Sequence, residues 1–350
     1  MVFLYFGWII VLVVLCNVFL LECEFFFCVC FIIALLLSAC KQNNKINQES
    51  IPNNFTSSNP TVSDTSSEES SEPVLLPESK PESSTPTKPT VPVKPQLINV
   101  TVGPYEIYDA LNSRGLSTTK SGFGYGVAKN GQPHSMSVNN QKRFDGMLNV
   151  EALALDTKST DKRMYLTFDC GYEYKNLTAD ILDTLKEKQV KAAFFLTGDY
   201  VKKNEALVQR MIDEGHIVGN HSWGHKSFPT ISREKMAKEI WQLEEYMKNK
   251  FNYSSPYFRF PSGEHSECAL ELVSSMGYKS IFWSAAYADW DTAKQPTKEN
   301  AVNTVTSRYH NGAVILLHAV SQANADGLAE MIDIARQQGY EFKTLDEYYQ

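Results

Sequence analysis

The feature that most constrains this chain is a regular alternation of short apolar runs with amphipathic segments from residue 163 onward. The apolar runs lie at 164–168, 192–196, 216–219, 257–259, 280–283 and 313–317. Near-continuous apolar runs are typical of parallel strands buried on both faces, with helices in the crossovers. The pattern therefore predicts an α/β fold. About seven strand–helix pairs favour an incomplete (β/α) barrel over a Rossmann sheet, and no glycine-rich fingerprint follows the first strand.

Several residues mark the ends of the predicted helices. Ser232 precedes the clearest amphipathic segment and is expected to be its N-cap, because a serine hydroxyl accepts a hydrogen bond from a free backbone N–H. Thr178 has the same expected role before the first helix. Gly215, Gly277 and Gly339 lie where helices should end, since glycine readily adopts the left-handed conformation there.

Residues 1–40 are almost wholly apolar, and Glu22 and Glu24 are the only charged residues among them. The segment closes with Leu-Ser-Ala-Cys, which resembles a bacterial lipobox and would place a lipid on Cys40. The cationic start of an export signal is missing, and residues 2–21 are long enough for a permanent membrane anchor. Both interpretations, lipoprotein signal and apolar anchor, attach the protein to a membrane and place the rest outside the cytoplasm.

Three regions follow the apolar segment. Residues 41–98 are rich in Ser, Thr and Pro, with Phe55 as their only aromatic residue, so we expect a disordered tether that buries too little apolar surface to fold. Residues 99–162 are less periodic and are predicted to be an irregular segment packed on the barrel. Residues 163–350 form the predicted barrel domain.

The net charge and the cysteine content limit which partners the chain can bind and whether disulfides can hold its fold. The formal net charge is −7 and no basic stripe stands out, so no nucleic-acid partner is expected. Of the 7 cysteines, only Cys170 and Cys268 belong to the expected folded domain. Two cysteines do not make a disulfide scaffold.

Polar residues able to do chemistry follow several predicted strands. Asp169 comes directly after the run 164–168, His318 after 313–317, and the pair His221 and His225 after 216–219. Amide hydrolysis needs a carboxylate to take a proton from water and an acid to protonate the departing amine. An i, i+4 histidine pair on a helical turn can bind a metal that polarises the carbonyl. Each residue alone could be structural, but the combination favours a metal-assisted hydrolase.

These motifs, in this order, resemble the polysaccharide deacetylases of carbohydrate esterase family 4, the NodB-homology domain, over residues 163–350. The matching strings are Thr-Phe-Asp-Cys-Gly at 167–171, His-Ser-Trp-Gly-His at 221–225, Arg-Phe-Pro-Ser-Gly at 259–263, Asp-Trp at 289–290 and Leu-Leu-His at 316–318. The resemblance implies a distorted (β/α) barrel with a catalytic domain over 163–350. It also implies a polysaccharide N-deacetylase, a hydrolase of amide bonds.

The resemblance assigns roles to named residues. Asp169 is implied as the catalytic base, kept ionised by Arg259, and His318 as the acid, kept protonated by Asp289. The cofactor implied is a divalent metal, with zinc expected. The candidate metal ligands are His221, His225 and the doubtful Cys170. The resemblance implies the backbone N–H of Ser262 as the oxyanion donor, and Trp290 and Leu316 as substrate contacts. Tyr172 and Glu173 lie near the expected site and are either further substrate contacts or residues that only pack or face solvent.

Longer strings around the motifs are similar to the delta-lactam-biosynthetic de-N-acetylases of spore-forming bacteria. This likeness implies that the substrate is N-acetylmuramic acid in peptidoglycan glycan strands, in a step toward the muramic delta-lactam of spore cortex. Cys170 replaces the family's usual Asp ligand; a thiolate binds zinc well, or the residue simply packs. Ser262 stands where some muramate deacetylases carry an arginine suited to the lactyl carboxylate, which weakens the expected preference for muramic acid.

Three other interpretations stay open. The substrate could be N-acetylglucosamine or a chito-oligosaccharide. The barrel could be a non-catalytic wall-binding lipoprotein, which Cys170 favours. The site could also belong to an unrelated amidohydrolase with a closed pocket, whereas a glycan enzyme needs an open groove. We further expect a monomer, an exposed His265, and core positions for Trp241 and Trp283.

Overall fold

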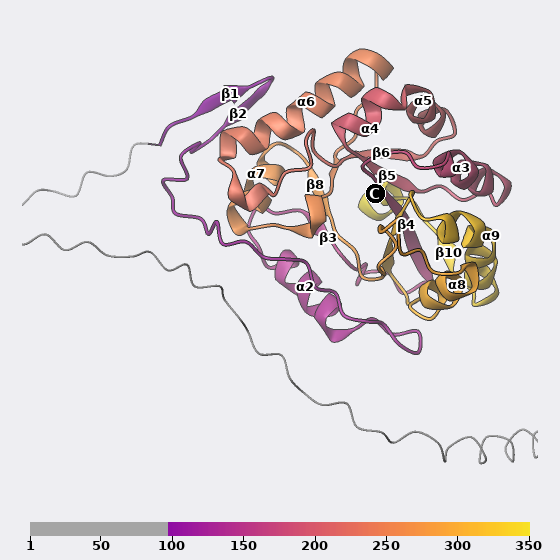
Figure 1. Ribbon diagram of the computed structural model, residues 1–350. Helices are drawn as coiled ribbons and strands as arrows, with labels where there is room; N and C mark the ends of the chain where they lie inside the picture. The colour runs from indigo at the N-terminus through magenta and orange to yellow at the C-terminus, as the bar shows by residue number, and fades with distance from the viewer. Residues whose placement is uncertain (1–96) are drawn as a thin grey trace, which may run out of the picture. The chain divides into compact units, whose positions relative to one another are not determined.

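The computed structural model describes residues 97–350, and Figure 1 shows strands at the centre with helices around them. Eight strands form one sheet in the order β10-β4-β5-β6-β7-β8-β3, and β9 also pairs with β4. Every one of these pairings is parallel. The strands are β3 (Ala152–Leu153), β4 (Arg163–Cys170), β5 (Ala193–Leu196), β6 (Ile217–Asn220), β7 (Tyr257–Phe258), β8 (Lys279–Ile281), β9 (Ala313–His318) and β10 (Glu341–Phe342).

The sheet curls back toward its beginning. A parallel bridge between Ala285 and Ile315 joins the segment after β8 to β9, which in turn pairs with β4. The predicted α/β fold with an incomplete (β/α) barrel is therefore confirmed, with eight strands where about seven were expected.

Helices fill the crossovers between the strands and cover the outside of the sheet (Figure 1). The crossover and C-terminal helices are α3 (Leu177–Glu187), α4 (Gly198–Lys203), α5 (Glu205–Asp213), α6 (Arg233–Phe251), α7 (Glu267–Ser275), α8 (Lys298–Thr306), α9 (Gln322–Gln337) and α10 (Leu345–Tyr349). Short 3-10 turns, η2 (Phe228–Thr230) and η3 (Pro261–Gly263), follow β6 and β7. These turns lie on the loops that carry two of the sequence motifs.

Alternate residues of β4 belong to different layers of the core. Phe168 and Cys170 lie in the apolar layer that also contains the inner faces of α3 and α9, whereas Tyr165 packs with Leu316 in a second apolar layer. Successive side chains of a strand point to opposite faces of the sheet. Asp169 and Cys170 are adjacent in the chain and therefore face opposite layers.

The helix ends were predicted in part. The Ser232 side chain accepts from the backbone N–H of Lys235, so it is the N-cap of α6 as expected. Gly215 has a φ of +76° directly after α5, as a helix-ending glycine should. Thr178 is not a cap: α3 already begins at Leu177, and the buried hydroxyl of Thr178 is hydrogen bonded to the hydroxyl of Tyr200 instead.

Residues 99–162 contain regular elements that the sequence pattern does not indicate. An antiparallel hairpin of β1 (Val100–Val102) and β2 (Tyr105–Ile107) packs on α6, and α2 (Ser135–Asp145) precedes β3, which joins the barrel sheet. Gly103, with φ +57°, lies against the Trp241 ring, where an added Cβ would be only 2.3 Å away. Trp241 is therefore a packing residue, and the segment supplies part of the sheet.

The predicted export segment 1–40, the proposed lipid site at Cys40 and nearly all of the predicted tether 41–98 lie outside the described residues. Within residues 97–350, no helix combines the length and the apolar composition that crossing a bilayer requires.

Candidate active site

The carboxyl ends of four parallel strands bring the predicted residues to one rim of the barrel. Asp169 at the end of β4 and His318 at the end of β9 are register partners, so their side chains lie next to each other on the same face. The register of β6 and β7 likewise places His221 beside Arg259. In (β/α) barrels this end of the strands carries the active site.

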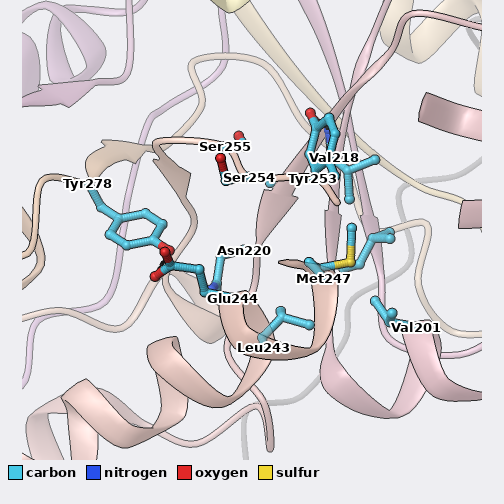
Figure 2. Close-up of a pocket in the computed structure, with 12 residues that line it drawn as sticks. Val201, Val218, Asn220, Leu243, Glu244, Met247, Tyr253, Ser254, Ser255 and Tyr278 are labelled. Carbon is cyan, nitrogen blue, oxygen red and sulfur yellow. Dashed lines mark hydrogen bonds between the residues drawn. The ribbon is translucent and has the colours of Figure 1, made fainter. Parts of the chain in front are cut away.

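An open cleft of about 1030 Å³ lies over these strand ends. Its lining includes Asp169, His221, His225, Ser262, Trp290, Leu316 and His318. A second cavity, between β6 and α6, measures about 20 Å³ and has room for about one water molecule (Figure 2). Glu244 in that cavity accepts a hydrogen bond from Tyr278 at 2.9 Å. The large cleft is therefore the candidate site.

Asp169 is held by a fully buried arginine. Arg259 Nη1 donates to Asp169 Oδ1 at 2.8 Å, and Nε and Nη2 donate to two backbone carbonyl oxygens at 2.9 and 3.2 Å. The guanidinium also lies 4.2 Å from the centre of the Phe195 ring. Burial by itself raises the pKa of Asp169, but nearby positive charges, that of Arg259 first, outweigh it and hold the pKa below its usual value. Asp169 is therefore ionised at neutral pH.

The histidine pair lies in a loop and not on the predicted helical turn. Residues 221–227 contain no helix, and Ser222 and His225 have left-handed backbone angles, with φ of 68° and 51°. The rings of His221 and His225 are nevertheless 4.9 Å apart. His221 Nδ1 donates to the carbonyl oxygen of Arg259 at 2.8 Å, which leaves Nε2 facing Asp169 Oδ2 at 3.6 Å.

Both imidazoles are suited to bind a cation. Burial lowers the pKa of His221 to about 4, although the charge of Asp169 opposes the shift, and burial also lowers the pKa of His225. Neutral imidazole nitrogens beside a carboxylate oxygen are the donor set that zinc prefers. No three His, Cys, Asp or Glu side chains between residues 97 and 350 already form a coordination group, so the fit is one of donor chemistry.

Cys170, the doubtful third ligand, does not join the histidines. Its side chain is fully buried in the outward apolar layer of β4, together with Phe168 and Leu177. Burial, with the nearby charges of Asp169 and Glu173, raises the pKa of this thiol well above its ordinary value. Cys170 thus lies on the opposite face of β4 from Asp169, in the packed position that was the alternative to a ligand role.

His318 is oriented by a buried carboxylate. His318 Nδ1 donates to Asp289 Oδ1 at 2.7 Å, and the His318 backbone N–H donates to Asp289 Oδ2 at 2.8 Å. Asn324 Nδ2 donates to the same Oδ2 at 2.6 Å. Burial favours the neutral imidazole, but the hydrogen bond and charge of Asp289 outweigh it and raise the pKa of His318. His318 can therefore hold a proton, and its Nε2 is free to deliver it.

The other predicted contacts divide into two groups. Ser262, Trp290, Leu316 and Tyr172 line the cleft. The Trp290 ring lies 5.8 Å from that of His318 and is largely exposed, as is Tyr172.

Glu173 does not line the cleft. Its Oε1 accepts from the Thr178 backbone N–H at 3.3 Å, and its Oε2 accepts from the Tyr200 hydroxyl at 3.1 Å. These bonds direct the carboxylate toward the start of α3 and not toward a substrate. The structure therefore favours a packing role for Glu173, the alternative to a substrate contact.

His265 is buried, with 2% of its surface exposed, although its polar neighbours predict an exposed loop residue. Arg143 Nη2 donates to His265 Nε2 at 2.8 Å across a separation of 122 residues in the chain. That contact has no local signal in the sequence. Trp283 is buried as predicted, and its ring also contributes to the wall of the cleft.

Two further parts of the site escaped the sequence reasoning. Asn324 is fully buried on α9 between Ala323 and Ala325, and a polar residue on the apolar face of a helix is a signal that periodicity could reveal. Phe123, Tyr125 and Val127 also line the cleft. Their i, i+2, i+4 spacing is the alternation of an extended chain that presents one side to a surface.

Comparisons with known proteins agree with this geometry. The family model described as polysaccharide deacetylase matches residues 156–281. The peptidoglycan-N-acetylmuramic acid deacetylase PdaA of Bacillus subtilis is 40% identical over 188 residues, which cover 53% of this chain and 71% of that protein. The peptidoglycan-N-acetylglucosamine deacetylase PgdA of Listeria monocytogenes is 33% identical over 190 residues, 54% of this chain and 39% of that protein.

A solved structure shows the same fold. The structure of Bacillus subtilis PdaA, a family 4 carbohydrate esterase, has a TM-score of 0.61 and 34% identity, and the match covers 66% of this chain and 97% of that one. The predicted family and reaction class are thereby confirmed. The chain belongs to the polysaccharide deacetylases of carbohydrate esterase family 4, which are hydrolases of amide bonds.

Proposed function

We propose that this protein is an exported peptidoglycan N-deacetylase that hydrolyses the acetamide of N-acetylmuramic acid by metal-assisted general acid/base catalysis. One observation carries the chemistry: Asp169 and His318 are register partners beneath one cleft. The pKa of the carboxyl is lowered and the pKa of the imidazole is raised. Two neighbouring groups whose pKa values are pushed apart in this way supply a base and an acid at the same pH.

Asp169 is the base in this mechanism. Its Oδ2 takes a proton from a water molecule while the water oxygen forms a bond to the acetamide carbonyl carbon. The carbonyl oxygen becomes an oxyanion, and the backbone N–H of Ser262 donates to it. His318 Nε2 then gives its proton to the amide nitrogen, the C–N bond breaks, and acetate and the free amine leave. Asp289 stabilises the imidazolium until that transfer.

His221 and His225 would hold the metal, with the carboxylate of Asp169 beside them. A bound divalent cation, zinc in this proposal, polarises the acetyl carbonyl and lowers the pKa of water. The hydrogen bond from His221 Nδ1 to the Arg259 carbonyl oxygen keeps Nε2 directed at the site. Arg259 thus orients both the base and one ligand.

The choice of substrate is supported by the relatives and by the shape of the cleft. The Bacillus subtilis relative is named for N-acetylmuramic acid, and the match covers 71% of it. N-acetylglucosamine is the alternative, since the Listeria monocytogenes relative is named for it, but the match covers only 39% of that protein. The exposed rings of Trp290 and Tyr172 along the cleft suit stacking against sugar rings of a polymer. The exposure of these two rings at the cleft also disfavours a small-molecule amidohydrolase with a closed pocket.

The acid/base arrangement favours catalysis over the non-catalytic interpretation. That interpretation rests on Cys170 in place of the usual ligand, and the packing of this side chain in the outward apolar layer leaves His221, His225 and Asp169 as the groups available to a metal. The base, the acid and their two supporting residues are all present with short hydrogen bonds. A wall-binding lipoprotein without activity would have no need of this arrangement.

Export and a role in spore cortex are further parts of the proposal. The apolar residues 1–40, which end at Cys40, support a lipid-anchored protein that faces the wall, and the delta-lactam role rests on the sequence strings alone. Incorporation of a labelled fatty acid into the full chain tests the anchor. We expect labelling that is lost in Cys40→Ala; equal labelling of both chains would overturn a lipid at Cys40.

Mass spectrometry of peptidoglycan fragments tests the function. After incubation with the full chain and zinc, we expect muramic acid residues that have lost their acetyl group, and none after incubation with Asp169→Asn. Loss of acetyl groups from glucosamine alone would contradict the substrate but keep the chemistry. No acetate from either peptidoglycan or chito-oligosaccharide would overturn the proposed function.

A further inference from the structure

The loop that carries Ser262 is held by a segment that precedes the region matched by the family model, which begins at residue 156. Ser121 and His265 form an isolated antiparallel bridge in which each backbone N–H donates to the carbonyl oxygen of the other, at 2.9 and 3.0 Å. Lys120 and Glu264 form an ion pair at 2.8 Å beside it. The chain from residue 117 to 121 therefore runs along the chain from residue 264 to 268.

The side chain of His265 continues this connection into the interior. Its Nδ1 donates to the carbonyl oxygen of Gly263 at 3.0 Å, and its Nε2 accepts from Arg143 of α2 at 2.8 Å. The ring lies 5.1 Å from the ring of Phe282 and 6.2 Å from that of Phe123. Burial lowers the pKa of His265, which is consistent with a neutral ring that donates at one nitrogen and accepts at the other.

The turn at 260–265 packs tightly against this segment. Gly263 has a φ of +67°, and an added Cβ would lie 2.8 Å from Phe123 and 2.7 Å from Trp283. Ser262 also has a left-handed φ, 55°, which costs free energy in a residue other than glycine. Such a conformation persists only when neighbouring contacts hold it in place.

One backbone N–H of the turn takes no part in the hydrogen bonds within the turn. Pro261 has no N–H, Gly263 donates to the Phe260 carbonyl oxygen at 2.9 Å, and Glu264 donates to the Pro261 carbonyl oxygen at 3.0 Å. The Ser262 N–H finds no acceptor within residues 97–350, and Ser262 lines the cleft. The turn thus carries one backbone donor without an acceptor among residues 97–350, on a residue that lines the cleft.

We propose that residues 117–143 are required for catalysis. They form a clamp, in which Arg143 contacts His265, that holds the turn at 260–265 and so fixes the Ser262 N–H as an oxyanion donor. His265 is a positioning residue that acts through Gly263 and touches no substrate. This inference rests on the proposed function, because it takes Ser262 as the donor to the tetrahedral intermediate. It places a requirement for catalysis in a segment upstream of the matched family region.

Three variants of the full chain test the clamp. His265→Phe keeps a ring among the aromatic side chains but removes both hydrogen bonds, whereas His265→Asn retains an amide N–H that can reach the Gly263 carbonyl oxygen. Arg143→Met removes the link to α2 at an exposed position. His216→Phe is the matched control, because His216 is also buried and hydrogen bonded to a backbone N–H, that of Ala192, at the opposite end of β6.

We expect kcat to fall by about 10- to 100-fold in His265→Phe with KM nearly unchanged, since a weakened oxyanion donor affects the transition state and not substrate binding. Arg143→Met should show a smaller fall of the same kind, and His265→Asn should recover most of the activity. His216→Phe should lower the Tm without lowering the kcat of the folded protein. The clamp is overturned if His265→Phe and His216→Phe have the same kcat, or if the loss in His265→Phe lies in KM.

Hydrogen–deuterium exchange separates this inference from the proposed function. Peptides that cover residues 258–266 should exchange faster in His265→Phe and Arg143→Met than in the unaltered chain or in His216→Phe. This readout needs no turnover. An unaltered chain that releases no acetate but shows the expected exchange would overturn the function and keep the clamp on the turn; unchanged exchange in all variants would overturn the clamp.

Discussion

Two buried carboxylates lie at the same rim of the barrel and are held in opposite ways. Asp169 accepts a hydrogen bond from the permanently charged Arg259 at Oδ1, and its Oδ2 faces the Nε2 of His221 at 3.6 Å. Asp289 has both oxygens occupied, by two N–H groups of His318 and by the amide of Asn324. A base needs a free oxygen, so Asp169 can accept a proton and Asp289 can only orient its neighbour.

The comparison also explains why the rim supports acid and base together. A fixed cation beside Asp169 keeps the pKa of its carboxyl low despite burial, while a saturated anion beside His318 keeps the pKa of the imidazole high despite burial. The two shifts have opposite signs within one pair of register partners. Changes at each carboxylate should therefore have different kinetic signatures.

Removing the free carboxylate should have the largest effect. In Asp169→Asn the acceptor for the water proton is gone, and we expect kcat to fall by about 10³-fold, within the range for loss of a general base. Steady-state acetate release measures this. Asp183→Asn, which changes an exposed carboxylate of α3 bonded to Arg210, is the control and should keep full activity. An Asp169→Asn protein that folds and retains a tenth or so of the activity would contradict the assignment of the base.

Replacing Asp289, whose two oxygens both accept hydrogen bonds, by neutral Asn should instead shift the pH dependence of activity. Asp289 raises the pKa of His318, so activity that needs the protonated imidazole is present at low pH and is lost as pH rises through that pKa. In Asp289→Asn the pKa falls, and the alkaline limb of the kcat/KM profile should move to lower pH while the acid limb, set by Asp169, stays. Equal movement of both limbs would show that the two carboxylates are not separable.

Asn324 offers a smaller and sharper test of the same site. Asn324→Ala leaves Asp289 Oδ2 with the His318 backbone N–H as a donor, so the orientation of the imidazole is weakened but not lost. We expect kcat to fall by about 3- to 10-fold, which corresponds to about 1 kcal/mol. A His318 that titrates as in the unaltered chain, by NMR of its ring protons, would rule out a positioning role for Asn324.

The smallest effect should come from Cys170, despite its place between Asp169 and Gly171 in the motif. Because the thiol faces the outward apolar layer, Cys170→Ala should keep the zinc content and change the activity by less than about 2-fold, with about 1 kcal/mol of lost stability from the smaller side chain. His221→Ala is the comparison and should lose the metal. Loss of zinc from Cys170→Ala, by atomic absorption, would return the residue to the ligand set.

The fold and the rim were largely accessible from the sequence because the signals are local. A buried strand that ends in Asp169 or His318 places its polar residue at the rim of any parallel barrel. The motif could not decide between ligation and packing for Cys170, because the pleat that turns it to the opposite face of β4 from Asp169 is not visible in the motif alone. His265 and Arg143 were missed because their contact joins residues 122 positions apart.

The central claim is that Asp169 and His318 act as one acid/base unit, and a double-mutant cycle tests it most directly. The kcat for acetate release is measured for the unaltered chain, for Asp169→Asn, for His318→Gln and for the double variant. If the residues are a unit, each single change removes most of the rate and the double variant is little slower than either. Losses that multiply in the double variant would show that the two residues act independently and would contradict the account.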